Sequence, residues 1–167
     1  AVPYSLPQFG FKKDYLPVLR DLGFTVLSQA NNHAYDHGPF GFASSTAFIR
    51  AAGIGVFGDY ENLDPGPYVV DVHGEKVAFI GYHQFTYSAG KVFDAIKSAH
   101  ASGAFVIVYP HWGVEYSPLV SDIQRERAHA FIDAGADLVL GSHPHVIQPI
   151  EVYRGKAIFY SMGNFIF

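Results

Sequence analysis

Short apolar segments alternate with helical segments along the chain, and this alternation limits the fold to the α/β class. Four segments have the apolar spacing of a helix, namely residues 13–22, 39–52, 92–101 and 121–134. Four short apolar runs read as strands, namely residues 24–28, 54–57, 104–109 and 138–140. Two further pairs of runs enclose glycine-containing turns and read as hairpins, namely 68–72 with 76–82 and 146–153 with 156–160. Alternation favours parallel pairing and hairpins are antiparallel, so we expect mixed sheets.

Composition excludes several classes of protein. The chain has 167 residues, a length typical of one domain, and 49% of them are hydrophobic. The formal net charge is −4 and there is no basic run, which argues against nucleic acid as a partner because phosphate binding needs clustered Lys and Arg. The chain has no cysteine, so disulfides and thiolate metal sites are excluded.

The first residues do not read as a signal peptide, and we expect no membrane span. No apolar run approaches the ~18 residues of a membrane span, and the first residues lack the basic and apolar regions of a signal peptide. Residues 1–10 are expected to form an irregular arm. The last residues, from 157 to 167, stop within an apolar segment, where native domains seldom end. We therefore expect residues 1–167 to be one domain in a fragment trimmed at the C-terminus, with trimming at the N-terminus left open.

Three polar segments directly follow three of the predicted strands. They hold five of the nine histidines, at positions 33, 37, 111, 143 and 145. In open α/β sheets, ligands bind beyond the carboxyl ends of the strands. We therefore expect the three segments to face one another and to form a site, because core packing alone does not explain such clustering.

His143 and His145 flank a single proline, which stiffens the segment between them. We interpret them as two imidazoles that diverge from one loop and serve two metal ions a few ångströms apart, as two-metal hydrolases require. The alternative is a turn that carries two solvated histidines. The other two histidine-bearing strand ends favour metal binding over this alternative.

His111 ends an apolar strand and is a candidate metal ligand, or else a hydrogen-bonded histidine at a strand end. Glu115 follows closely, as a residue that orients a ligand or as a surface charge. Asn32 offers an amide oxygen to a hard divalent ion. His33 is placed to donate a proton, and Asp36 to hold its tautomer. Taken alone, the Asn32 segment is better explained as an asparagine-rich turn.

Together these segments resemble the signature motifs of the bacterial capsule-synthesis family, the CapA-type proteins of poly-γ-glutamate synthesis. The resemblance covers the chain from about Leu16 to its end, with the motifs in the right order. The segments that carry it are Asn31-Asn32-His33-Ala34-Tyr35-Asp36-His37-Gly38, His111-Trp112-Gly113-Val114-Glu115-Tyr116, Ala134-Gly135-Ala136-Asp137-Leu138-Val139, Gly141-Ser142-His143-Pro144-His145-Val146 and Tyr160-Ser161-Met162-Gly163-Asn164-Phe165-Ile166-Phe167.

That family is similar to calcineurin-like metallophosphoesterases, so the resemblance implies a four-layer α-β-β-α sandwich with mixed sheets and a dinuclear metal centre. It implies that Asn32, His111 and His143 hold one metal and that His145 holds the other. It implies that His33 is the catalytic histidine. Supporting roles fall to four further residues, namely Asn31, Asp36, Glu115 and Asn164.

The sequence departs from the family pattern before Asn31. Such domains begin with a strand that ends in an aspartate-bearing motif, and a second acidic motif follows it; neither precedes Asn31 here. By this count one metal position keeps three protein ligands and the other keeps only His145. We therefore expect one or two divalent ions, with Mn, Zn and Fe all suited to His and Asn donors. The missing N-terminal strand comes from a removed segment, from another chain, or not at all.

The leading hypothesis is a metal-dependent phosphoester hydrolase of capsule or poly-γ-glutamate synthesis, in which a cation lowers the pKa of water towards ~7. Its substrate would be the polymer or a phosphorylated small-molecule precursor. One alternative is a non-catalytic assembly component of a membrane-attached synthesis complex, with other membrane-bound capsule proteins as partners. Another is a metal-dependent amide hydrolase that acts on a γ-linked polymer. The resemblance implies the bacterial cell envelope, at the extracytoplasmic face.

Overall fold

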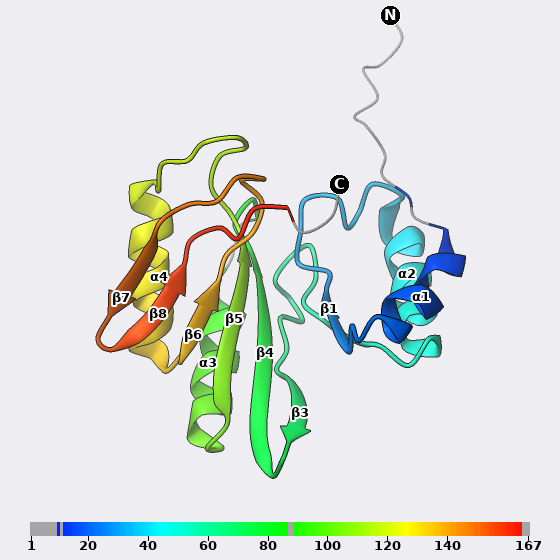
Figure 1. The fold of residues 1–167 in the computed structure, drawn as a ribbon, viewed down its shortest axis with the longest axis horizontal. Coiled ribbons are helices and arrows are strands. Elements are labelled where there is room, and N and C mark those ends of the chain that lie inside the picture. The colour runs from blue at the N-terminus through cyan, green and yellow to red at the C-terminus, as the bar shows by residue number, and fades with distance from the viewer. Residues whose placement is uncertain (1–9, 11, 87–88, 165–167) are drawn as a thin grey trace, which may run out of the picture.

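The computed structural model describes residues 10, 12–86 and 89–164 (Figure 1). Its helical elements are η1 (Lys13–Tyr15, a 3-10 turn), α1 (Leu16–Asp21), α2 (Gly38–Ala51), α3 (Gly90–Ala101) and α4 (Asp122–Ala134). Its strands are β1 (Val26–Ser28), β2 (Gly55–Phe57), β3 (Tyr68–Val72), β4 (Glu75–His83), β5 (Phe105–His111), β6 (Leu138–Leu140), β7 (Ile150–Tyr153) and β8 (Lys156–Phe159). The arm expected over 1–10 lies outside the described residues except for its last residue, and so do the last three residues of the apolar C-terminal segment.

The described strands form a six-stranded sheet in the order β3-β4-β5-β6-β8-β7 and a two-stranded sheet of β1 and β2. In the larger sheet, β4, β5, β6 and β8 run parallel to one another. The edge strands β3 and β7 each pair in antiparallel fashion with their hairpin partners, and β1 pairs with β2 in parallel. The expected α/β class, the mixed sheets and both hairpins are therefore confirmed.

Two expected elements differ most from the structure, one because it is divided and one because it begins four residues later, and a proline accounts for each. The helix expected over 13–22 is divided into η1 and α1, because Pro17 lies in the first turn of α1, where its missing N–H is tolerated. The strand expected to begin at residue 146 begins at Ile150. Pro149 has no N–H to donate to the ladder, so the pairing before it is reduced to one isolated bridge.

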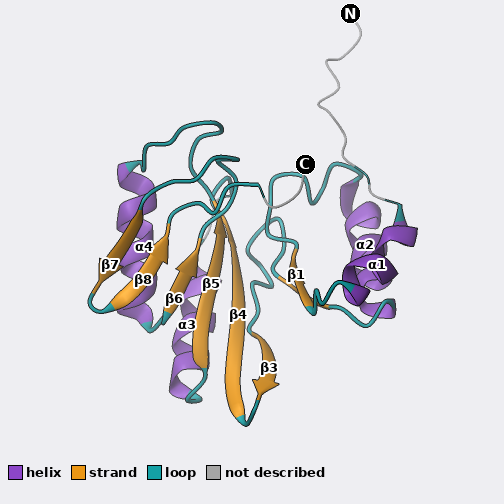
Figure 2. Cartoon of the chain, viewed as in Figure 1, coloured by secondary structure: helices purple, strands orange, loops and turns teal. Residues whose placement is uncertain are grey.

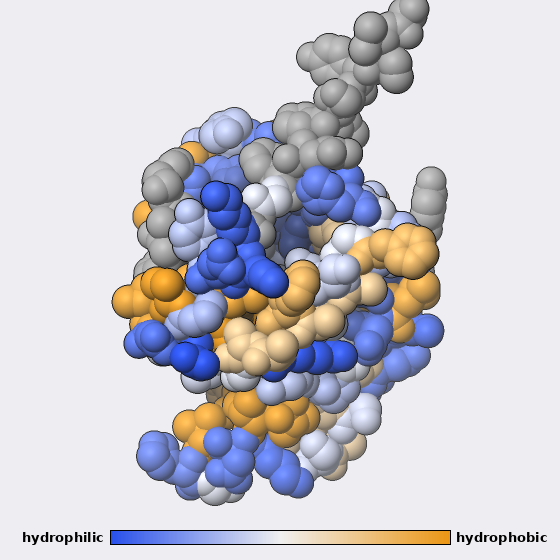
Figure 3. All heavy atoms as spheres, turned by 90° about the vertical axis from the view of Figure 1, so that its right-hand side faces the viewer, coloured by the Kyte–Doolittle hydropathy of each residue, from blue (hydrophilic) through white to orange (hydrophobic). Residues whose placement is uncertain are grey.

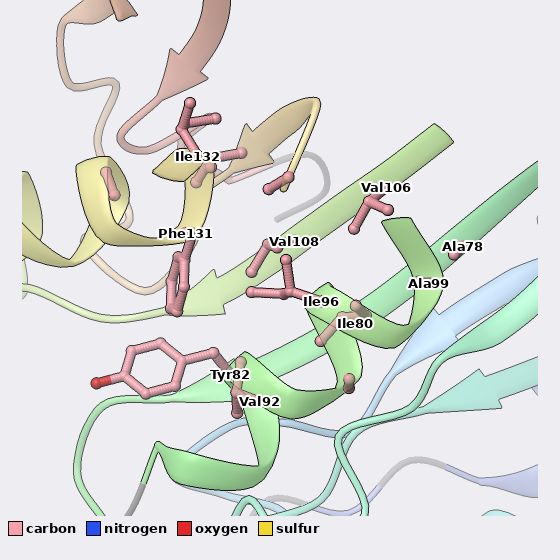
Figure 4. Packing of buried hydrophobic residues seen from close by; sticks show 14 of the residues in the cluster. Ala78, Ile80, Tyr82, Val92, Ile96, Ala99, Val106, Val108, Phe131 and Ile132 are labelled. Atoms are coloured by element: carbon pink, nitrogen blue, oxygen red, sulfur yellow. The ribbon is translucent and has the colours of Figure 1, made fainter. Parts of the chain in front are cut away.

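The main core lies between the larger sheet and helices α3 and α4 (Figures 1 and 4). Helix α4 begins with a capping box, in which Ser121 and Gln124 satisfy each other's backbone N–H groups. Phe131 of α4 is fully buried and stacks on Trp112 with ring centroids 6.3 Å apart. Because Trp112 follows β5 directly, this contact anchors the carboxyl end of β5 in the core.

A second, smaller cluster holds helices α1 and α2 against β1 and β2. Its buried members are Ile49, Ile54 and Val56, far fewer than the main core contains. Phe40 on α2 is 88% exposed, and Figure 3, which faces this side of the molecule, shows apolar residues interspersed with polar ones. The two sheets also contact each other directly, with the ring centroids of Phe57 of β2 and Phe79 of β4 5.7 Å apart.

The two sheets meet where the backbones of Gly58 and Gly81 approach each other closely. A Cβ atom added to Gly81 would lie 2.8 Å from Gly58 Cα and 2.9 Å from Ala30 Cβ, so the contact has no room for a side chain. Ala30 is 2% exposed and immediately precedes the Asn31–His33 segment. This glycine contact therefore sets the distance between the segment after β1 and the end of β4.

We expect Gly81→Ala to push the two sheets apart and to lower the free energy of unfolding by about 1–3 kcal/mol, as overpacking does. Urea unfolding measures the effect. Gly74→Ala in the same hairpin is the control, because its added Cβ meets nothing within 4 Å, although φ there is 91°. A Gly81→Ala variant that unfolds at the same urea concentration as the unaltered protein would contradict the proposed role of the contact.

Candidate metal centre

The candidate site lies along the carboxyl ends of β4, β5 and β6, where the segment after β1 also arrives (Figure 2). His83 of β4 and His111 of β5 are partners in the parallel ladder, and an isolated bridge joins His111 to Ser142 after β6. The Gly58–Gly81 contact brings Asn32 to the same edge. The expected meeting of the three polar segments is thus what the fold produces.

Asn32 and His111 are in direct contact although 79 positions separate them in the sequence. Asn32 Oδ1 lies 2.8 Å from His111 Nε2. Two adjacent ligand atoms of a cation bound at ~2.1 Å lie roughly 3.0–3.4 Å apart, so a small adjustment would let both atoms bind one ion. The same two atoms can instead share a proton, as a hydrogen bond from Nε2–H to the amide oxygen.

Ser142 can stabilise the state of the His111 ring in which Nε2 is free of a proton. Its hydroxyl donates to Pro110 O at 3.0 Å, which leaves its lone pairs facing His111 Nδ1 at 3.3 Å. With the ring proton on Nδ1, Nε2 presents a lone pair to the lone pairs of Asn32 Oδ1. Two acceptors at this distance repel each other unless a cation lies between them.

His111 is held in the neutral form that a metal ligand requires. Burial is the main cause that lowers its pKa to about 2, and the neighbouring imidazoles of His143, His83, His145 and His33 lower it further. A protonated His111 would be an unpaired buried charge among other histidines. The ring is therefore a neutral donor at any physiological pH.

His143 lies beside His111, with ring centroids 4.6 Å apart. Its Nδ1 atom is buried and has no hydrogen-bond partner among the described residues. Burial lowers its pKa, and the carboxylate of Glu115 opposes that effect. A buried, unpaired ring nitrogen next to a second imidazole is a feature that a bound cation would satisfy.

The backbone of this loop is strained at both histidines. His143 has a φ of 97° and His145 a φ of 61°. Both values lie in the left-handed region, which residues other than glycine rarely adopt. Such strain persists where the surrounding structure enforces it and is typical of functional sites. The two imidazoles have ring centroids 6.1 Å apart and are tilted by 53°, and each offers a ligand atom to one group with Glu115.

That group places one atom each of Glu115, His143 and His145 within 4.8 Å of one another. The orientation of His145 is fixed by Asn164, whose Oδ1 accepts from His145 Nδ1 at 2.7 Å. With the ring proton on Nδ1, the Nε2 atom of His145 carries the lone pair that can bind a metal. Hydrogen bonds from outer residues orient metal-binding histidines in this way. Glu115 is thus placed to bind a cation itself and not only to orient another ligand. Asn164 has the expected supporting role, because it holds the ring of His145.

His33 forms a dyad with Asp36. His33 Nδ1 lies 2.9 Å from Asp36 Oδ2, and Asn32 Nδ2 lies 3.3 Å from His33 Nε2. The carboxylate therefore favours the tautomer with the proton on Nδ1. Asn31 shapes the turn, because its Oδ1 accepts from His33 N at 2.9 Å. All the predicted residues of this segment are consequently connected to the His111 side of the site.

A cavity of about 270 Å³ opens between the loops. Its lining includes Asn31, His111, His143, His145 and Asn164. The volume gives room for a cation together with several water molecules or a small anion. Neutral imidazole nitrogens, an amide oxygen and one carboxylate form a donor set that suits divalent transition metals.

His37 lies outside the histidine cluster, although its polar segment predicted it to belong there, and His83 lies within the cluster without having been predicted. His37 is exposed and precedes α2, where its Cβ packs against Gly41. His83 is fully buried, and its ring centroid lies 6.0 Å from that of His111. The overlooked signal was its position, because His83 ends an apolar strand as His111 does.

Comparison with known proteins identifies the family. A family model described as bacterial capsule synthesis protein PGA_cap matches residues 2–167. The chain belongs to this family. The resemblance to CapA-type proteins inferred from the motifs is therefore confirmed.

Several curated relatives of this PGA_cap chain are named for polymer synthesis. It is 38% identical over 176 residues to the PGA biosynthesis protein CapA of Bacillus subtilis (strain 168). The matched region covers 93% of the chain and 46% of the relative. It is 33% identical over 178 residues to the capsule biosynthesis protein CapA of Bacillus anthracis, covering 93% of the chain and 43% of the relative. A probable polyglutamine synthesis accessory protein of Mycobacterium tuberculosis is 28% identical over 181 residues, which cover 92% of the chain and 48% of that protein.

The PGA_cap chain thus spans less than half the length of these relatives. Across the part of the chain that the structure describes, no helix has both the length and the apolar character needed to cross a bilayer.

Proposed function

We propose that this chain binds a divalent cation through Asn32, His111 and His143 and forms the cation-binding part of a phosphoester hydrolase of capsule or poly-γ-glutamate synthesis. The observation that carries the proposal is the 2.8 Å contact between Asn32 Oδ1 and His111 Nε2, with the His143 ring beside it. The names of the curated relatives support the biological setting.

The layer arrangement of the family is part of the same proposal. Helices α3 and α4 pack on one face of the larger sheet, and α1 and α2 pack against the smaller one. We take these four groups as the α, β, β and α layers of a metallophosphoesterase-like sandwich. The carboxyl ends of the central strands then form the wall of the active site.

Each residue has a separate part in this chemistry. A bound divalent cation supplies Lewis-acid activation of water and of a phosphoryl oxygen. Asn32, His111 and His143 hold it with neutral donors. His33, oriented by Asp36, has its Nε2 atom 3.3 Å from Asn32 Nδ2, and we assign to this nitrogen the exchange of a proton with the leaving oxygen.

A second cation position is proposed at His145. The ligand atoms of Glu115 and His143 lie near it, and Asn164 holds the ring. One or two ions of Mn, Zn or Fe fit these donors. The substrate is proposed to be the polymer or a phosphorylated precursor of it, and the location to be the extracytoplasmic face of the cell envelope.

We expect His33→Ala to lower turnover of a generic phosphodiester by roughly 10²–10⁴-fold, the usual contribution of an acid–base residue, while metal content stays unchanged. Steady-state hydrolysis and elemental analysis of the intact protein measure the two quantities. His37→Ala, outside the cluster, should change neither. Full activity of the His33→Ala variant would remove His33 from the mechanism.

A non-catalytic role is the second candidate. It is favoured by the name of the mycobacterial relative, a probable polyglutamine synthesis accessory protein. In that case the intact protein should contain no metal and should bind other membrane-bound synthesis proteins. Metal in the purified protein together with hydrolysis of a phosphodiester would support the phosphoester hydrolase. Hydrolysis of a γ-glutamyl amide, without hydrolysis of a phosphodiester, would support an amide hydrolase instead.

A further inference from the structure

His83 is the buried histidine to which neither the motifs nor the family comparison assigns a role. It ends β4 and is completely inaccessible to solvent. Asn62 fixes its backbone from both sides, since Asn62 Oδ1 accepts from His83 N at 2.7 Å and Asn62 Nδ2 donates to His83 O at 2.8 Å. The position of the ring is thus determined by a buried amide and not by chance packing.

The hydrogen bonds of the ring identify its free donor atom. His83 Nδ1 lies 2.8 Å from Tyr60 O, and a carbonyl oxygen can only accept, so the proton is on Nδ1. Nε2 therefore carries a lone pair. It is buried and has no hydrogen-bond partner among the described residues. An unsatisfied buried acceptor costs about 1–3 kcal/mol, which calls for a group that satisfies it.

The surroundings of His83 consist of the other rings of the site. Its ring centroid lies 6.0 Å from that of His111 and 5.4 Å from that of Phe85, and Phe85 lies 4.8 Å from His143. His83 and His111 are also direct partners in the parallel ladder. After burial, which is the larger cause, the imidazole of His83 contributes to the lowered pKa of both His111 and His143.

We infer that His83 Nε2 is a fourth ligand of the cation held by Asn32, His111 and His143, an inference that rests on the cation position of the proposed function. Two ring nitrogens of this group, His83 Nε2 and His143 Nδ1, are buried without a partner in the described part of the chain, and a shared ion would satisfy both if the side chains drew in around it. The position then offers three imidazoles and one amide oxygen.

This donor set defines the class of cation and of the remaining ligand. Imidazole donors suit Zn²⁺, Co²⁺ and Ni²⁺, whereas Mg²⁺ and Ca²⁺ prefer carboxylates and water. None of the four donors is charged, so the site keeps the full double charge of the ion for an anion such as phosphate. Three histidines with an open position resemble, in coordination alone, the catalytic zinc sites that retain a water.

Titration of the metal-free intact protein with Zn²⁺, followed by calorimetry, tests the inference in His83→Gln and His83→Phe. We expect Zn²⁺ affinity about 10–100-fold below that of the unaltered protein, while His37→Gln binds as the unaltered protein does. Substitution with Co²⁺ should show a visible spectrum that differs between the unaltered protein and the His83 variants. Unchanged affinity and an unchanged Co²⁺ spectrum in both His83 variants would overturn the role of His83 and leave the site of the proposed function intact.

A measurement on the unaltered protein covers the case in which the variants do not fold. The ring ¹⁵N resonances of the histidines report which nitrogen binds the ion. On addition of one equivalent of Zn²⁺, the Nε2 resonance of His83 should shift together with that of His111. A shift of His111 without His83 overturns the inference alone, whereas no shift in any histidine overturns the cation site as well.

Discussion

Replacement of His143 by alanine is expected to weaken cation binding by more than about 100-fold, because even the outer partners of metal ligands contribute 10–100-fold to affinity. His143 is central in two respects. Its ring lies beside His111, and one of its atoms also belongs to the group with Glu115 and His145. A single substitution therefore removes a donor from both proposed positions. Metal content after dialysis and calorimetric titration measure the loss.

A glycine variant separates the ligand role of His143 from its place in the fold. The φ of 97° favours glycine over alanine, so His143→Gly should be more stable in the metal-free state than His143→Ala by about 1–2 kcal/mol. Neither variant should bind the cation. His145→Ala is the matched control and should keep the position formed with Asn32 and His111. Wild-type metal content in either His143 variant would contradict this account.

Gly141→Ala is expected to lower the free energy of unfolding by about 3 kcal/mol, at the upper end of the range for overpacked cores. A Cβ at this position would lie 2.0 Å from Tyr160 O and 2.7 Å from Trp112 Nε1. Both neighbours are buried, and Trp112 Nε1 donates to Tyr160 O at 2.8 Å. The added atom would displace this bond and move the loop that carries His143, so the affinity for the cation should fall as well.

Fluorescence of Trp112, the one tryptophan of the sequence, follows the unfolding of this region in denaturant. Gly103→Ala provides the comparison, because its added Cβ meets nothing within 4 Å and only its φ of 77° opposes the side chain. That variant should lose about 1–2 kcal/mol. If Gly141→Ala unfolds at the same denaturant concentration as Gly103→Ala, the close packing of Gly141 does not hold the loop in place.

The sequence was sufficient to predict the class of fold and most elements, because apolar period and turn residues are local properties. The strand over 138–140 and the helix over 121–134 lie where the pattern places them. The strand expected from residue 146 began later because Pro149 outweighs the apolar pattern around it. Where a proline or a glycine lies within an apolar segment, its backbone conformation and hydrogen bonding set where the strand or helix begins and ends.

The site was only partly predictable, because its geometry depends on contacts between distant segments. The motifs pointed to Asn32, His111 and His143, yet their proximity follows from the contact of Gly58 with Gly81, which has no local signature. The inclusion of His37 and the omission of His83 have one cause. His37 lies in a polar segment and His83 does not. Which histidines meet depends instead on the register of the parallel strands, which pairs His83 with His111.

Anomalous diffraction at the zinc edge, from crystals of the protein grown with Zn²⁺, tests the shared cation most directly. The account predicts one strong peak at ~2.1 Å from Asn32 Oδ1, from His111 Nε2 and from a ring nitrogen of His143, the usual range of zinc–ligand bonds. A peak elsewhere in the molecule, with the side chains of these three residues directed apart, would contradict it.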